Sequence, residues 1–180
     1  MHALLRFARF IDDVNARTGK AVAWLGLAAV IVCTANAVAR YALNIGSNAW
    51  LELQWYFNSA VFLLVAAYAL QRNDHVRIDV LNSKLSPKAQ AWIDILGGLF
   101  FLLPTVVIIG WLSWPSLVNS YAIQEYSADP GGLIRWPVRL LIPIAFGLLG
   151  LQAISEVIKR FAFLKGLIPA SEFEKKAHAT

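Results

Sequence analysis

Four long apolar stretches, separated by shorter polar segments, dominate the chain. They contain no Asp, Glu, Lys or Arg, and they are residues 21–39, 53–70, 95–124 and 140–155. A helix rises about 1.5 Å per residue, so stretches of this length approach or exceed the roughly 30 Å of a bilayer's hydrocarbon core. The pattern therefore predicts an all-α integral membrane protein with four transmembrane helices. Their expected bounds are 21–43, 50–70, 88–114 and 136–158.

The first 20 residues show a different period. Apolar residues recur there at helical spacing, and the intervening positions are charged, as at Arg6, Arg9, Asp13 and Arg17. This pattern predicts an amphipathic helix over residues 1–20 that lies on the inner membrane surface. A cleaved signal peptide is less favoured for residues 1–39, because the apolar run is longer than a usual signal core. Residues 161–180 are expected to form a cytoplasmic tail.

The most polar segment lies between the second and third stretches. Residues 71–80 hold five charged or titratable side chains, namely Arg72, Asp74, His75, Arg77 and Asp79. Such a cluster is too costly in hydrocarbon and predicts a loop at one membrane surface. His75 could titrate near neutrality, or it could cap a turn or bind a lipid headgroup. Ser86 and Pro87 then predict the start of the third span, and Pro104 predicts a kink within it.

The distribution of Lys and Arg predicts the orientation. Thirteen basic residues lie in the N-terminal segment, the central loop region and the tail; they are Arg6, Arg9, Arg17, Lys20, Arg72, Arg77, Lys84, Lys88, Lys159, Arg160, Lys165, Lys175 and Lys176. Three lie near the two other loops; they are Arg40, Arg135 and Arg139. Basic residues favour the cytoplasmic side, so both termini and the central loop are predicted to be inside.

Composition agrees with a membrane protein of one domain. The 180 residues are 58% hydrophobic and 15% charged, with a formal net charge of +5. The basic residues flank apolar runs, so topology and lipid headgroups explain the charge better than nucleic acid does. The single cysteine, Cys33, allows no disulfide within the chain and no Cys/His metal set.

Few residues match the patterns of known catalytic or cofactor-binding sites. The three histidines, His2, His75 and His178, lie outside the predicted spans, which argues against a haem site. The acids lie at span ends or in loops rather than at mid-membrane. We therefore expect no catalytic residue, no metal, no cofactor and no substrate site in this chain. A partner subunit is favoured, although a four-helix membrane anchor of a respiratory complex that binds quinone or haem is an alternative.

Three motifs carry a resemblance to a known family. The first is Arg40-Tyr41 followed by Trp50-Leu51-Glu52-Leu53, and the second runs from residue 68 to residue 80 and on to Leu85-Ser86-Pro87. The third is Glu125-Tyr126-Ser127, Pro130-Gly131-Gly132-Leu133 and Arg135-Trp136-Pro137, then Leu141-Ile142-Pro143. Over residues 40–156 the chain resembles the small membrane subunit of tripartite ATP-independent periplasmic (TRAP) transporters.

The resemblance implies a bacterial inner-membrane protein with two partners, a large membrane subunit and a periplasmic substrate-binding protein. The complex would import an organic acid using an ion gradient, usually of sodium, and this subunit would act as a scaffold among membrane lipids. Candidate contacts with a partner or with lipid follow for nine residues. They are Arg40, Trp50 and Glu52 at the outer edge, Arg72, His75, Arg77 and Asp79 at the inner edge, and Glu125 and Ser127 in the outer loop. Arg40 could also pair with Glu52.

Overall fold

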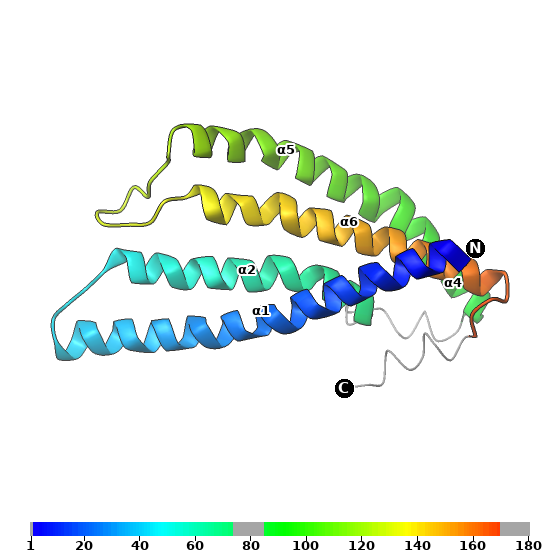
Figure 1. Ribbon diagram of the computed structural model, residues 1–180, viewed down its shortest axis with the longest axis horizontal. Helices are drawn as coiled ribbons and strands as arrows, with labels where there is room; N and C mark the ends of the chain where they lie inside the picture. Colours follow the sequence, from blue (N-terminus) through cyan, green and yellow to red (C-terminus); the bar gives the residue numbers. More distant parts are fainter. Residues whose placement is uncertain (1, 74–84, 170–180) are drawn as a thin grey trace.

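The computed structural model describes residues 2–73 and 85–169 and has four long helical rods (Figure 1). The elements are α1 (His2–Ala42), α2 (Asn48–Arg72), α4 (Pro87–Gly97), η1 (Gly98–Leu102), α5 (Leu103–Ala122) and α6 (Trp136–Leu164). The elements α4, η1 and α5 form one rod, and each of the four rods is long and apolar enough to cross a membrane. The prediction of an all-α protein with four spans is confirmed.

The helix α6 is the centre of the arrangement. It packs against α1, α2, α4 and α5, whereas α1 and α5 lie at opposite edges (Figure 1). The segments 43–47 and 123–135 share one end of the molecule, called the loop end here. The N-terminus and residues 165–169 share the other, called the terminal end (Figure 1). This sharing of ends is what an even number of spans requires. The inside location of the termini stays a prediction.

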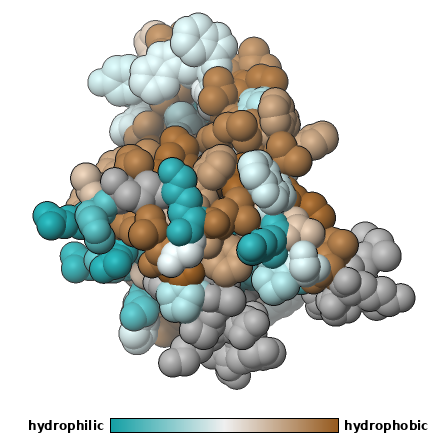
Figure 2. Space-filling model, turned by 90° about the vertical axis from the view of Figure 1, so that its right-hand side faces the viewer, coloured by the Kyte–Doolittle hydropathy of each residue, from teal (hydrophilic) through white to brown (hydrophobic). Residues whose placement is uncertain are grey.

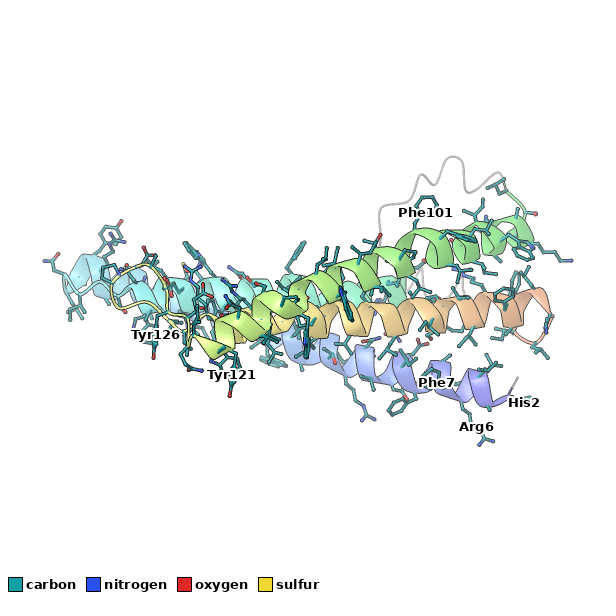
Figure 3. All side chains as sticks on the ribbon, turned by 90° about the horizontal axis from the view of Figure 1, so that it is seen from above. His2, Arg6, Phe7, Phe101, Tyr121 and Tyr126 are labelled. Atoms are coloured by element: carbon teal, nitrogen blue, oxygen red, sulfur yellow. The ribbon has the colours of Figure 1, made fainter. Side chains whose placement is uncertain are left out.

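The N-terminal segment differs from the prediction. Residues 1–20 do not form a separate amphipathic helix, because α1 runs without a break from His2 to Ala42. One stripe of buried residues explains the continuity: Leu5, Ala8, Ile11, Asn15, Gly19 and Val22 are spaced by three or four residues across the expected boundary. The stripe packs Leu5 against Ala162 of α6, while Phe7 on the same segment stays exposed (Figure 3).

The helix α1 changes partners along its length. Its N-terminal part lies against α6, and beyond Gly19 it lies against α2 (Figure 1). Gly19 marks the closest approach, since a Cβ there would lie 2.6 Å from Cγ of Tyr68. Only glycine permits this spacing, and it brings α1 onto the last turns of α2. The residues before Gly19 therefore continue past the end of α2.

The third rod begins as predicted. The Ser86 side chain accepts a hydrogen bond from the Ala89 backbone N–H at 3.3 Å, and Pro87 occupies the first turn. The disturbance expected at Pro104 takes the form of the π-helical turn η1 directly before it. Because proline has no N–H to donate, the ladder shifts, and the Leu103 N–H donates to the Gly98 carbonyl five residues back.

Two helices end later than the sequence predicts. The third rod passes Pro115 and ends at Ala122 rather than at Trp114, so the outer loop is shorter than expected. A proline removes only one ladder hydrogen bond, and the apolar residues after it continue the helical face through the buried Leu117. The helix α6 begins at Trp136, as predicted, but continues to Leu164 rather than Ile158. Its added turn carries Ala162, which is fully buried against α1.

Candidate functional site

A small hairpin closes the loop end. Tyr126 and Ile134 form an antiparallel bridge, the Ser127 N–H donates to the Leu133 carbonyl at 3.0 Å, and the Arg135 N–H donates to the Glu125 carbonyl at 2.7 Å. These bonds join the two arms that follow α5 and precede α6. The loop therefore has a defined backbone shape.

The tip of the hairpin is a tight turn whose residues suit it. The Gly132 N–H donates to the Asp129 carbonyl at 3.0 Å across the turn. Pro130 stands at the second position, and Gly131 at the third with φ of 73°. A type II turn requires this positive φ and favours this proline, so the Pro-Gly-Gly run sets the tip.

Glu52 fastens the hairpin to α2. Its carboxylate accepts a hydrogen bond from the Ser127 hydroxyl through Oε1 and one from the Leu133 backbone N–H at 2.6 Å through Oε2. Arg135 joins this arrangement through Ser127, since its Nη2 donates to Ser127 Oγ at 3.3 Å. Glu52 is 5% exposed, and a Cβ on Gly132 would lie 2.8 Å from its Oε1. We call Glu52, Ser127, Leu133 and Arg135 the loop-end cluster.

Further contacts hold the hairpin from both sides. From α2, Asn48 Nδ2 donates to the Pro130 carbonyl at 2.9 Å and the Tyr56 hydroxyl donates to the Ile134 carbonyl at 3.0 Å. From α6, Arg139 forms an ion pair with Glu125 at 2.7 Å and also donates to Ser116 Oγ at 2.7 Å. The hairpin thus ties together α2, α5 and α6.

A second polar group lies between α1 and α6. The terminal-end cluster consists of Asp12, Asn15, Gln152, Ser155, Glu156 and Lys159. Lys159 Nζ lies 3.0 Å from both carboxylate oxygens of Asp12 and 2.5 Å from Glu156 Oε1. Two carboxylates therefore share one ammonium, and the Lys159 residue is buried.

Neutral side chains complete the terminal-end cluster. Gln152 Nε2 donates to Asp12 Oδ1 at 2.9 Å and lies 3.0 Å from Glu156 Oε1. Asn15 Nδ2 donates to Gln152 Oε1 at 2.7 Å, and the Ser155 hydroxyl lies 3.1 Å from both Asp12 Oδ1 and the Ala8 carbonyl. Each charged group thereby has polar neighbours, which such burial requires.

The terminal-end cluster lies beyond the stretch where α1 packs on α2. At about 1.5 Å per residue, Asp12 lies about 10 Å further toward the terminal end than Gly19, which already contacts the last turns of α2. The cluster therefore lies beyond the turns of α2 that contact Gly19. Figure 2 views this end and shows hydrophilic side chains gathered among hydrophobic ones.

A third contact region joins α2, α4 and α6 at the terminal end. Arg160 Nη2 pairs with Asp94 Oδ2 at 2.9 Å, and both residues line a cavity of about 280 Å³ together with Gly97 and Gly98. Arg72, at the end of α2, donates to the Tyr68 hydroxyl at 3.1 Å, and its guanidinium carbon lies 5.7 Å from the centre of the Tyr68 ring. Arg72 thus caps the region of closest approach between α1 and α2.

The structure brings some of the predicted site residues together. Glu52 and Ser127 meet directly, and Glu125 pairs with Arg139 beside them. The suggested Arg40–Glu52 pair is not what the structure has, because Ser127 and Leu133 occupy the Glu52 carboxylate. Arg40 and Trp50 are exposed near the 43–47 turn, and Arg72 lies on Tyr68. The remaining inner-edge candidates, His75, Arg77 and Asp79, lie outside the described residues.

Sequence reasoning missed the terminal-end cluster. The amphipathic pattern singles out Asp13 and not Asp12, and Lys159 counts only as an orientation charge. A signal was present, because Gln152, Ser155, Glu156 and Lys159 recur at three- and four-residue spacing on one face of α6. Over residues 2–73 and 85–169, no three His, Cys, Asp or Glu side chains come together as a metal site would require.

Comparison with known proteins gives two matches. The model of the family described as tripartite ATP-independent periplasmic transporters, DctQ component, matches residues 10–163. A protein of Haemophilus influenzae named "Putative TRAP transporter small permease protein" is 31% identical over 100 residues, which are 54% of this chain and 61% of that protein. The chain thus spans about three fifths of the length of that curated relative. No solved structure matches significantly.

Proposed function

Because the chain belongs to the DctQ component family of the TRAP transporters, a family of inner-membrane transporter subunits and not of enzymes, we propose that it scaffolds a large membrane subunit in the bilayer. In this role the four rods form a fixed wall, and the partner carries the substrate site. The respiratory-anchor alternative finds no support in the family match.

The observation that carries the proposal is how much apolar surface the helices leave open. In each rod, 28% or less of the most apolar 18-residue window is buried within the chain. Phe101 is 77% exposed and Trp111 is 78% exposed, and Phe101 points away from α6 (Figure 3). Such faces suit lipid and a second membrane protein, and they leave ample surface for a partner within the bilayer.

The loop-end cluster supports a second contact. Its hairpin is fastened to three helices, and Tyr126 is 66% exposed beside it (Figure 3). A fixed loop with an exposed aromatic side chain loses little conformational entropy when a partner binds. In the predicted orientation this end faces the periplasm, so we assign to it the contact with a periplasmic substrate-binding protein.

The transported compound and the coupling ion belong to the same proposal. We expect import of an organic acid that is driven by an ion gradient, with sodium as the coupling ion. The support is the family alone, since no substrate site is expected in this chain.

Purification from native membranes tests the scaffold. The tagged chain, extracted in mild detergent, should bring with it a larger protein with many spans in fixed ratio. Recovery of the chain alone, or with iron–sulfur or flavin subunits, would contradict the proposal. The assembled complex, reconstituted with its binding protein, should then take up a radiolabelled organic acid only when a sodium gradient is imposed.

A further inference from the structure

Two adjoining cavities flank the turn between α1 and α2. The first, of about 200 Å³, is lined by Asn36, Arg40, Gly46, Ser47, Asn48 and Leu51. The second, of about 220 Å³, is lined by Ala35, Asn36, Ala39, Ile45, Ser47 and Trp50. Asn36 and Ser47 line both, so the two cavities adjoin, and together they are called the turn pocket here. One half is polar and contains Arg40, and the other is apolar and contains Trp50.

Asn36 is the unusual residue of the turn pocket. It is 8% exposed, and it lines both halves. Within the described part of the chain, its side chain forms no hydrogen bond. A buried amide without a partner costs free energy in a protein interior, so a polar group from outside the chain is the expected partner.

The surroundings of Asn36 favour an anion. Arg40 lies one helical turn further along α1 and supplies a cation to the same half of the pocket. The helix α2 begins here, and Ser47 occupies its N-cap position in extended backbone without a side-chain capping bond. The first backbone N–H groups of α2 therefore stay available at the positive end of the helix dipole.

The neighbouring polar groups do not neutralise this site. Asn48 directs its amide to the Pro130 carbonyl, and the Glu52 carboxylate is occupied by Ser127 and Leu133. The cation at Arg40 thus faces the pocket beside a helix N-terminus and a buried amide.

The apolar half identifies the class of ligand. A free phosphate ion would fill only the polar half and would leave the space beside Ile45 and Trp50 open. We propose that the turn pocket binds one glycerophospholipid. Its phosphodiester lies against Arg40, Asn36 and the α2 N-terminus, and the start of one acyl chain lies against Trp50. This inference concerns a site that the scaffold role does not require.

Native mass spectrometry of the full chain in detergent, titrated with dioleoylphosphatidylglycerol, tests the proposal. One lipid should bind more tightly than any further ones. Arg40→Gln should lower the affinity for the first lipid about tenfold, since it removes a charge-assisted contact. Asn36→Leu keeps a similar volume, removes the amide and should weaken it about threefold. The matched control is Arg9→Gln, an exposed arginine at the other end of the same helix, which should bind like the wild type.

Two further ligands separate the possible sources of the phosphate. Dioleoylglycerol has the chains without phosphate and should not occupy the first site. Inorganic phosphate at millimolar concentration should not displace the lipid. Displacement would overturn the lipid assignment in favour of a free anion, and equal losses in Arg9→Gln and Arg40→Gln would show general attraction to the membrane and overturn the site itself. Unchanged melting temperatures of the variants would show that each is folded.

Discussion

The two ends of the molecule hold carboxylates with little exposure by different means. At the loop end, Glu52 is held by a hydroxyl and a backbone N–H of a hairpin. At the terminal end, Asp12 and Glu156 are held by one ammonium, that of Lys159. The first arrangement depends on the backbone shape of a loop. The second depends on charge balance between two helices.

The difference predicts how each end fails. Removal of Lys159 would leave the Asp12 and Glu156 carboxylates facing each other without the ammonium between them, which should weaken the contact between α1 and α6. A change at the loop end would loosen a hairpin whose arms still bond to one another. Stability should therefore depend most on charge balance at the terminal end and on backbone geometry at the loop end.

The largest effect is expected for Lys159→Met. Breaking a buried ion pair by removing one partner costs about 3–5 kcal/mol, so the free energy of unfolding in detergent should fall by this amount. Hydrogen exchange should rise over the first turns of α1. The double variant Asp12→Asn/Lys159→Met removes one of the stranded charges and should recover part of the loss. Lys165→Met, at an exposed position, is the control, and an equal loss there would refute the charge argument.

Glu52→Gln should come next. The amide keeps the shape of the side chain but loses the charge-assisted bonds, at a cost of about 1.5–3 kcal/mol. The effect should appear as faster hydrogen exchange at the Leu133 amide and faster proteolysis of residues 123–135, with α1 unchanged. Asp129→Asn, on the exposed turn, serves as the control. Loosening at α1 in Glu52→Gln would show that the two ends are not independent.

Gly132→Ala tests the geometry of the loop end without changing any charge. The added Cβ would lie 2.5 Å from the Ser127 Cβ and 2.8 Å from Glu52 Oε1, so the hairpin must shift, at about 1–3 kcal/mol. Gly147→Ala is the matched control, because a Cβ there meets open space. The double variant Gly132→Ala/Glu52→Gln should lose less stability than the two single losses added together, since both changes disturb the same contact. Simple additivity would contradict a single loop-end cluster.

The smallest effect is expected for Arg139→Gln. Its pair with Glu125 is partly exposed, with side chains 31% and 24% accessible, and such pairs contribute about 0–1 kcal/mol. High salt should bring the wild type and the variant closer together in melting temperature. A larger loss of stability that high salt does not reduce would contradict this assignment and show that the pair behaves as a buried ion pair does.

The sequence predicts the number of rods because a charge-free apolar run of bilayer length rarely forms anything other than a transmembrane helix. It also predicts the start at Ser86, since a cap is a local property. It does not predict helix ends such as Ala122. Pro115 is typical of a residue that ends a helix, whereas here the packing continues past it. It names Glu52 and Ser127 separately, but a contact across 75 positions is set by how α2 and the hairpin pack. Asp12 and Lys159 are missed for the same reason.

The distance along the chain between Asp12 and Lys159 has a consequence for synthesis. The two residues are 147 positions apart, so the partner of Asp12 emerges only near the end of translation. At about 5–20 residues per second, the ribosome takes about 7–30 s to add that length. During this time the first turns of α1 lack the surface that buries them. The terminal-end cluster can therefore form only after α6 has been synthesised.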